Sequence, residues 1–195
     1  MRRFFAIVTV CLIVDFASGC ASPPSRFYTL TAGTTAATTS SNLSVAVGPV
    51  SVPEVVDRPE IVLTTGPNQV RLDEFNRWAS PLQNNISRTV AENLVLMLGT
   101  PRVTLFSQAF IADADYRVAI DVQRFESALG EAATLDAVWT VRRAKDGKAE
   151  TGRTTVRETM QGNGYDVLAA AHSRAVARLS SDIADAVRAL GRSGQ

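Results

Sequence analysis

YRVAIDVQRF, at residues 116–125, carries the clearest strand pattern in the chain. Apolar side chains stand at every second position from Tyr116 to Val122, and Arg117, Ala119 and Asp121 stand between them. A period of two places alternate side chains on opposite faces of a β-strand. The segment is therefore predicted to be a strand with one face in the core and one toward solvent, as is common in antiparallel sheets.

Two further strands are predicted on the C-terminal side of this segment, at residues 135–143 and 150–160. Lys145-Asp146-Gly147-Lys148 lies between them. Asp-Gly between two strand-like segments is a strong signal for a tight hairpin, because glycine readily adopts the positive φ that such turns need. Together the three segments predict an antiparallel meander of three or four strands.

Strand patterns also recur in the N-terminal half of the chain. Residues 60–65 and 69–73 are strand-like and are separated by Gly66-Pro67-Asn68, which favours a turn, so this pair is predicted to form a hairpin. By contrast, residues 31–42 are almost entirely Thr, Ala, Ser and Gly, offer little to bury and are predicted to form a mobile loop. The other strand candidates are residues 27–30, 43–48 and 102–106.

Two helices are predicted, each with one apolar face. The first is expected to begin at Ser80, with Pro81 at the first helical position and Gln83 completing a capping box, and to end at Gly99. The second is expected over residues 166–190. Apolar side chains recur every three or four residues, at Leu82, Ile86, Val90, Leu94 and Met97 in the first helix and at Leu168, Val176, Leu179, Ile183, Val187 and Leu190 in the second.

Runs of strands interrupted by two separated helices indicate an α+β fold. We predict a mostly antiparallel sheet with the two main helices packed on one of its faces. The folded part is expected to be a single domain over residues 27–195, a length that suits one core.

The first 20 residues have the order of a secretory signal. Arg2 and Arg3 precede an apolar run at residues 4–14, and Ala17-Ser18-Gly19 precedes Cys20. The apolar run is too short to span a bilayer, which needs roughly 20 apolar residues. We predict that residues 1–19 are a signal peptide whose removal leaves Cys20 at the new N-terminus. The alternatives are an ordinary secretory signal with an incidental cysteine and an uncleaved anchor helix.

The residues around Cys20 resemble the lipobox of bacterial lipoproteins. This resemblance implies that Cys20 carries a diacylglycerol thioether and an amide-linked fatty acid such as palmitate. Two or more acyl chains hold a protein firmly at a membrane, whereas one chain holds it only marginally. Residues 20–26, which include Pro23 and Pro24, are then the lipidated cysteine and a short stiff tether.

The charge and cysteine content limit the possible partners. The full chain has 20 basic and 19 acidic residues, and the signal peptide contains Arg2, Arg3 and Asp15, so the mature protein is formally neutral. This balance does not favour nucleic acid as a partner. The chain has two cysteines, Cys11 in the signal peptide and Cys20, so acylation of Cys20 leaves no thiol for a disulfide.

His172 is the only histidine, so any Ser-His-Asp or histidine–metal chemistry would depend on it. It falls on or beside the apolar face of the second helix, and we interpret it as a packed structural residue. The sequence contains no Gly-x-Ser-x-Gly nucleophile motif, no Gly-Lys-Ser/Thr phosphate loop and no zinc cluster. We expect no catalytic residue, no cofactor and no metal, and therefore no enzyme activity.

Asp57, Arg58 and Trp78 are the candidate partner-binding residues. Asp57 and Arg58 precede Pro59 in a proline-bounded loop, where binding residues often occur, although an Asp57–Arg58 interaction would also fix the turn. Trp78 stands just before the first helix, where an indole is either part of the core or part of an interface. A further basic cluster, interpreted as solvated and protecting a sheet edge, consists of Arg142, Arg143, Lys145 and Lys148.

Several segments, taken in order, resemble a known family. They are SRFYTL at residues 25–30, VGPV at 47–50, DRPEIV at 57–62, FNRWASPL at 75–82, and YD and AHSRA at 165–166 and 171–175. They resemble the ABC-type transport auxiliary lipoproteins, the paraquat-inducible PqiC-like family. The most specific piece is RWASPL, in which Ser80 stands where Glu is expected, so any contact made by an acidic residue there would be lost.

The resemblance implies an accessory lipoprotein of a system that moves lipids between the inner and outer membranes of a diderm bacterium and supports membrane integrity. The implied partners are a periplasmic protein with mammalian-cell-entry (MCE) domains and an inner-membrane ABC permease or ATPase. The implied location is the outer membrane, lipid-anchored and facing the periplasm. A homo-oligomeric ring seating the end of a tubular bridge would suit this role.

Two rival hypotheses stay open at this point. One is an envelope hydrolase that uses Ser173 or another serine with His172. The other is a structural lipoprotein that tethers peptidoglycan or another envelope complex.

Overall fold

The computed structural model describes residues 23–35, 37, 40–106 and 114–192. The predicted signal peptide and Cys20 lie outside the described residues. The helices are α2 (Leu82–Leu98), α3 (Tyr165–Arg192) and a short 3-10 helix, η1 (Glu54–Val56). The strands are β1 (Arg26–Tyr28), β2 (Val45–Ser51), β3 (Glu60–Gly66), β4 (Gln69–Trp78), β5 (Val103–Leu105), β6 (Tyr116–Ala128), β7 (Ala132–Arg143) and β8 (Ala149–Thr159).

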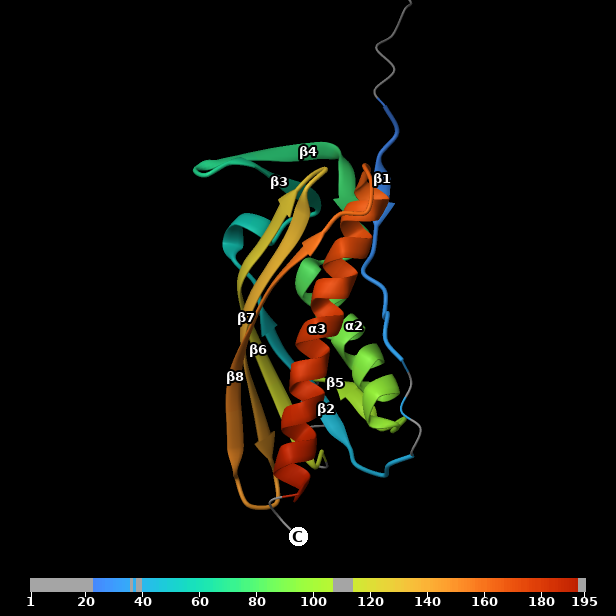
Figure 1. Cartoon of the computed structure of the whole chain (residues 1–195), viewed down its shortest axis with the longest axis vertical. Helices are drawn as coiled ribbons and strands as arrows, with labels where there is room; N and C mark the ends of the chain where they lie inside the picture. The colour runs from blue at the N-terminus through green and yellow to red at the C-terminus, as the bar shows by residue number, and fades with distance from the viewer. Residues whose placement is uncertain (1–22, 36, 38–39, 107–113, 193–195) are drawn as a thin grey trace, which may run out of the picture.

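The described strands form one eight-stranded sheet built around β6 (Figure 1). One edge of β6 pairs with β7 along its whole length, and β7 pairs with β8, so the predicted meander is confirmed. The opposite edge of β6 is shared by two strands. Its first half pairs in parallel with β2, and its far end contacts β3 at Ser127.

Two short strands complete the sheet. β5 pairs in parallel with β2, and β1 pairs in parallel with the end of β4. The predicted hairpin of β3 and β4 is confirmed, and β4 continues beyond Asp73 to Trp78, where β1 provides its partner. The sheet is therefore mixed, although most of its paired residues belong to antiparallel ladders.

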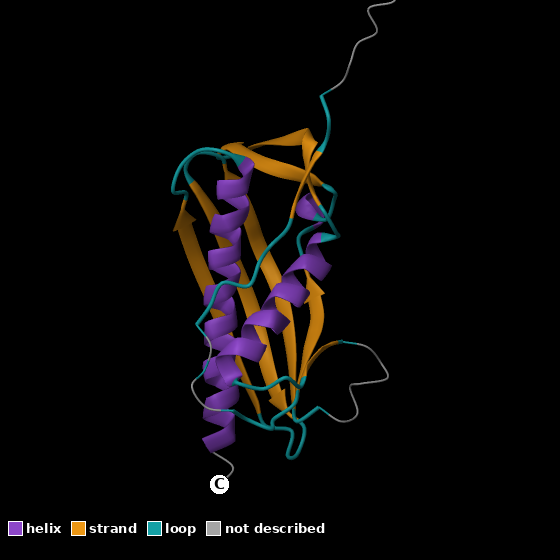
Figure 2. Ribbon diagram, turned by 90° about the vertical axis from the view of Figure 1, so that its right-hand side faces the viewer, coloured by secondary structure: helices purple, strands orange, loops and turns teal. Residues whose placement is uncertain are grey.

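Both long helices cover the same face of the sheet (Figure 2). α3 packs on β7 and β8, α2 packs on β2 and β5, and the two helices contact each other. The predicted α+β class is confirmed. No helix among the described residues combines the length and the apolar character needed to cross a membrane.

The apolar patterns predicted the core correctly. In β6, Tyr116, Val118, Ile120 and Val122 are buried, and the residues between them are exposed. Burying one such aliphatic side chain stabilises the fold by about 1.5–3 kcal/mol. The predicted stripes are buried at Leu82, Ile86, Val90 and Leu94 of α2, with Met97 partly buried, and at Leu168, Val176, Leu179, Ile183, Val187 and Leu190 of α3.

The start of α2 differs from the prediction. The N-cap residue is Pro81, with φ −47° and ψ 136°, and no side chain caps the helix, so the predicted capping box of Ser80 and Gln83 is wrong. Backbone hydrogen bonds from Trp78 N to Pro59 O (2.7 Å) and from Ala79 N to Tyr28 O (2.8 Å) hold the approaching chain against neighbouring segments. The helix therefore begins one residue later than the capping signal indicates.

The described residues of the segment 31–42, namely 31–35, 37 and 40–42, lack regular secondary structure, as predicted, but they are tied to both helices. Thr31 N donates to Ser173 Oγ of α3 at 3.1 Å, and Gly33 N donates to Asn93 Oδ1 of α2 at 3.2 Å. Figure 2 shows this segment crossing over the two helices. Its small side chains bury little, and its attachment depends on polar contacts instead.

Candidate functional site

The candidate site is an open recess where the loop after η1 meets the end of β4 and the start of α2. Its volume is about 400 Å³. The hydrogen bond from Trp78 N to Pro59 O, 2.7 Å long, joins its two sides. We call it the α2 recess; the residues that line it are Asp57, Arg58, Pro59, Trp78, Ala79, Ser80 and Pro81.

The α2 recess brings together the three predicted partner-binding residues, Asp57, Arg58 and Trp78. They lie far apart in the sequence and meet because the β3–β4 hairpin returns the chain to the loop where β3 begins. The three residues therefore share one surface, and partner binding by them stays a prediction.

Asp57 and Arg58 are exposed at the α2 recess. The turn that carries them is fixed by backbone hydrogen bonds, from Asp57 N to Glu54 O (3.2 Å) and from Arg58 N to Val56 O (2.9 Å). Among the residues that the structure describes, the Arg58 guanidinium has no ion pair or side-chain hydrogen bond, and Asp57 receives one weak hydrogen bond, from Gln83 Nε2 at 3.4 Å. Both charges therefore point to solvent rather than to each other.

Trp78 is mainly a core residue. Its side chain is 5% exposed and packs edge-on against Phe125 and His172, with ring centroids 6.0 Å apart in both cases. Trp78 is one of the residues that line the α2 recess, but little of it is accessible there. Trp78 therefore joins the α2 recess to the core, and direct contact with a partner stays a prediction.

His172 is fully buried, in agreement with the interpretation as a packed structural residue. Its Nε2 lies 2.8 Å from Ser127 Oγ, and its ring stacks on Phe125 with centroids 3.9 Å apart. Burial lowers the pKa of His172 to about 3, because the apolar surroundings penalise the charged imidazolium. His172 is therefore neutral near pH 7.

The Ser173–His172 pair required by the hydrolase hypothesis does not form. Ser173 Oγ donates to Ala169 O at 2.8 Å and accepts the hydrogen bond from Thr31 N. The serine that contacts His172 is Ser127, which is itself 2% exposed. A hydrolytic nucleophile must reach its substrate, and this buried pair does not.

The basic hairpin between β7 and β8 differs from the prediction at Arg143. Arg143 is 6% exposed, and its guanidinium contacts both carboxylate oxygens of Asp146, with Nη2–Oδ2 and Nε–Oδ1 distances of 2.6 and 3.0 Å. It also donates to Leu190 O of α3. The hydrogen bonds from Arg143 lower the pKa of Asp146 to about 2. Arg143 therefore links the hairpin to the end of α3. It is buried, so the prediction that it belongs to a solvated basic cluster is wrong.

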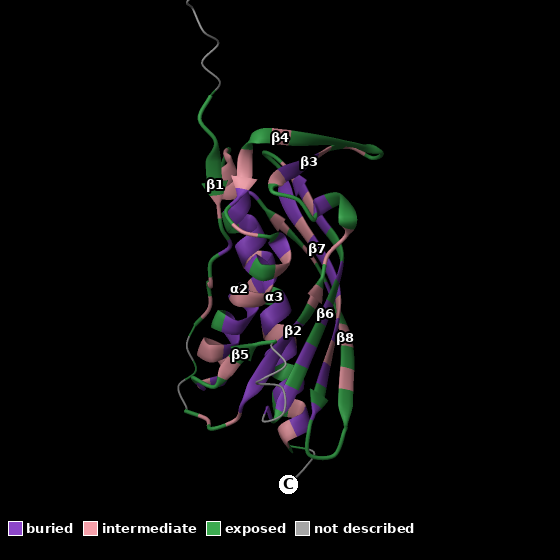
Figure 3. Ribbon diagram, turned by 180° about the vertical axis from the view of Figure 1, so that it is seen from behind, coloured by how far each residue is buried: buried purple, intermediate pink, exposed green. Residues whose placement is uncertain are grey.

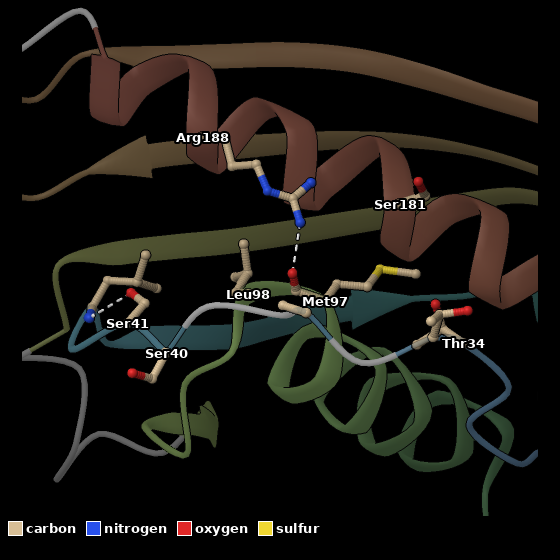
Figure 4. Close-up of a pocket in the computed structure, with 10 residues that line it drawn as sticks. Thr34, Ser40, Ser41, Met97, Leu98, Ser181 and Arg188 are labelled. Atoms are coloured by element: carbon tan, nitrogen blue, oxygen red, sulfur yellow. Dashed lines mark hydrogen bonds between the residues drawn. The ribbon is translucent and has the colours of Figure 1, made fainter.

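A second recess lies between residues 34–43, the end of α2 and the last turns of α3 (Figure 4). Its volume is about 570 Å³ and its lining is rich in hydroxyl groups. Arg188 donates to Met97 O at 2.6 Å and to Asp185 Oδ1 at 2.7 Å, so its charge is already compensated. Within the described ranges, no group of three His, Cys, Asp or Glu side chains is placed to hold a metal ion.

The chain matches one protein family by sequence and several solved structures by fold. The family model of ABC-type transport auxiliary lipoprotein components matches residues 28–184. The crystal structure of XCC0632 from Xanthomonas campestris, a DUF330 protein, is 20% identical, with a TM-score of 0.72, covering 88% of this chain and 100% of that chain. The crystal structure of an uncharacterized protein is 22% identical, with a TM-score of 0.69, covering 85% of this chain and 99% of that chain.

No curated protein matches the chain by sequence. The two solved structures show the fold, and the family match extends over the β3–β4 hairpin, α2, the meander and most of α3. The resemblance first noted in the sequence motifs is thus confirmed, and the chain belongs to the family of ABC-type transport auxiliary lipoprotein components.

Proposed function

We propose that the chain is a non-catalytic, lipid-anchored accessory subunit of an MCE/ABC-type intermembrane lipid transport system. Acyl chains on Cys20 hold it at the outer membrane, facing the periplasm. The folded domain docks the transport bridge at that membrane and thereby supports membrane integrity. Its partners are a periplasmic MCE-domain protein and an inner-membrane ABC permease or ATPase.

The observation that carries this proposal is the position of Cys20 next to the family match. Cys20 ends a signal-like segment, and the match to the auxiliary lipoprotein family begins at Tyr28. A domain so close to an acylated residue stays at the membrane surface. Anchoring raises the effective concentration of a partner near that surface without requiring any new contact.

The α2 recess is the docking surface in this proposal. Asp57 and Arg58 are exposed, and the Arg58 guanidinium has no partner within the described part of the chain. A guanidinium on a fixed turn is suited to a carboxylate of a partner, because it can donate two parallel hydrogen bonds. Trp78 is packed against Phe125 and His172, so its side chain does not need to be ordered when the partner binds.

Affinity purification of the tagged full-length chain from detergent-solubilised envelopes tests the proposal. We expect an MCE-domain protein and ABC transporter subunits to be recovered with it. Recovery of cell-wall fragments without any MCE-domain protein would instead support the structural tether. An envelope-barrier defect caused by His172→Gln at unchanged protein level would support the hydrolase.

A further inference from the structure

A smaller recess lies between the β3–β4 hairpin, η1 and the end of β6. Its volume is about 230 Å³. Figure 1 shows the hairpin reaching out beyond the meander, with the segment around η1 below it. We call this site the hairpin recess; its apolar lining residues include Val55, Val56, Val62, Val70 and Phe125.

The apolar lining of the hairpin recess is partly core and partly exposed. Val56, Val62 and Phe125 are at most 7% exposed and belong to the hydrophobic core. Val55 and Val70 are 50% and 52% exposed, and they come from two different elements, η1 and β4. Apolar residues that are exposed singly need no explanation, but these two line one recess together with core residues. The recess is therefore an apolar surface open to solvent.

The register of the hairpin adds one more residue to this surface. Leu72 stands opposite Val62, and Val70 stands opposite Thr64. Directly opposed residues of an antiparallel pair share a face, so Leu72, which is 43% exposed, lies on the face that lines the recess. Among the described strands, β3 alone pairs with β4 over residues 69–73, and Figure 3 shows most of β4 exposed. A two-stranded hairpin is only marginally stable alone, so a partner on this face would stabilise it.

The hairpin recess and the α2 recess adjoin each other. Val56 lines the first and the next residue, Asp57, lines the second, in a turn that the hydrogen bond from Val56 N to Pro53 O (3.0 Å) helps to fix. A second link is aromatic: Trp78 of the α2 recess packs edge-on against Phe125 of the hairpin recess, with ring centroids 6.0 Å apart. The two recesses therefore share the η1 loop and an aromatic pair.

Size and charge indicate what occupies this combined surface. The hairpin recess, at about 230 Å³, is smaller than the roughly 300–1,000 Å³ of pockets that enclose small-molecule ligands. It suits one large apolar side chain, the kind of anchor that dominates many protein interfaces. In the adjoining α2 recess, the Arg58 guanidinium has no partner within the described part of the chain, which suits a carboxylate.

We propose that one segment of a protein partner occupies both recesses. It places a carboxylate on Arg58 and, a few residues away, a large apolar side chain in the hairpin recess. The apolar anchor supplies most of the affinity, and the charged contact favours the correct partner. The inference rests on the proposed docking function of the α2 recess and names the chemistry of the segment that docks there.

A charge placed beside the hairpin recess tests this proposal. In the full-length acylated chain, Val70→Arg should reduce the recovery of the MCE-domain protein at least about tenfold, because it blocks the site of an anchor side chain. The matched control is Leu105→Arg on β5, since Leu105 is 45% exposed and Figure 1 places β5 away from the hairpin. Recovery with the control should stay within about twofold of wild type, as expected outside the interface. Thermal unfolding should show both variants folded like the wild type.

Photo-crosslinking identifies the occupant. Val70 is replaced by benzoylphenylalanine, cells are irradiated, and mass spectrometry maps the peptide joined to position 70. We expect a peptide of the MCE-domain protein, joined at an apolar residue that has an Asp or Glu a few residues away. A lipid adduct, an adduct with a second copy of this chain, or no adduct would overturn the inference.

Equal recovery of the MCE-domain protein with Val70→Arg and Leu105→Arg would also overturn the inference, while leaving the proposed function in place. Failure of the wild-type chain to recover any MCE-domain protein would remove the proposed function and this inference together. The wild-type sample thus separates the two failures.

Discussion

The imidazole of His172 stacks on the ring of Phe125, with ring centroids 3.9 Å apart and an interplanar angle of 9°. This packing leaves the imidazole fully buried and lowers its pKa from 6.5 to about 3. The structure thus keeps its single histidine neutral over the whole range in which histidines usually titrate. The consequence is a pH dependence of the free energy of unfolding.

The free energy of unfolding should fall as the pH drops below 6.5. The unfolded chain binds a proton at His172 near pH 6.5, whereas the folded chain does not until about pH 3, so acid favours unfolding. The expected loss is about 1.4 kcal/mol per pH unit between these values. Urea unfolding from about pH 7.5 to about pH 4.5 measures it, above the range in which carboxylates dominate.

The variant His172→Gln is the control for this pH dependence. It should be less stable near pH 7, because the stacked ring is lost, and its stability should change little between pH 6.5 and pH 4.5. An unchanged slope in the variant would show that another group causes the acid sensitivity.

Gly152→Ala should lower the free energy of unfolding by about 1–3 kcal/mol, the usual cost of overpacking a core. Gly152 lies opposite Trp139 in the β7–β8 ladder, and a Cβ on it would come within 2.2 Å of the indole. The indole cannot move aside easily, because its Nε1 donates to Thr154 Oγ1 at 3.0 Å. Chemical denaturation measures the loss. The control is Gly33→Ala, where no heavy atom lies within 4 Å of the added Cβ, and a similar loss there would refute the steric explanation.

Arg58→Glu should reduce the recovery of the MCE-domain partner by at least about tenfold, because reversing a charge in a hydrogen-bonded contact costs roughly 2 kcal/mol or more. Thermal stability should not change, since Arg58 is exposed and its guanidinium has no partner in the described part of the chain. Arg178→Glu makes the same charge change on an exposed position of α3. Equal recovery with both variants would remove the α2 recess from the docking surface.

Local patterns in the sequence predicted most elements of the fold. The alternation from Tyr116 to Val122 indicated both the strand and its buried face, and Gly147, with φ 74°, adopts the conformation that the hairpin signal required. Periodicity shows which side of a strand is buried, but it does not show which strand lies beside it. The sharing of one edge of β6 by β2 and β3, and the parallel pairing of β1 with β4, are long-range contacts and could not be predicted in this way.

The candidate site was predictable only in part. Proline-bounded loops and an indole before a helix indicated Asp57, Arg58 and Trp78, but only the fold shows that they line one recess. Burial of Arg143 could have been predicted, because it continues the inward positions of Trp139 and Val141 in β7. The basic residues around it made a solvated cluster the simpler interpretation.

The account depends most directly on acylation of Cys20. Metabolic labelling with an alkyne-tagged palmitate, followed by purification of the tagged chain, measures it. We expect label on the wild-type protein and none on Cys20→Ser, together with a shift of the variant from the membrane fraction to the soluble fraction. An unlabelled wild-type protein whose fractionation is identical to that of Cys20→Ser would contradict the account.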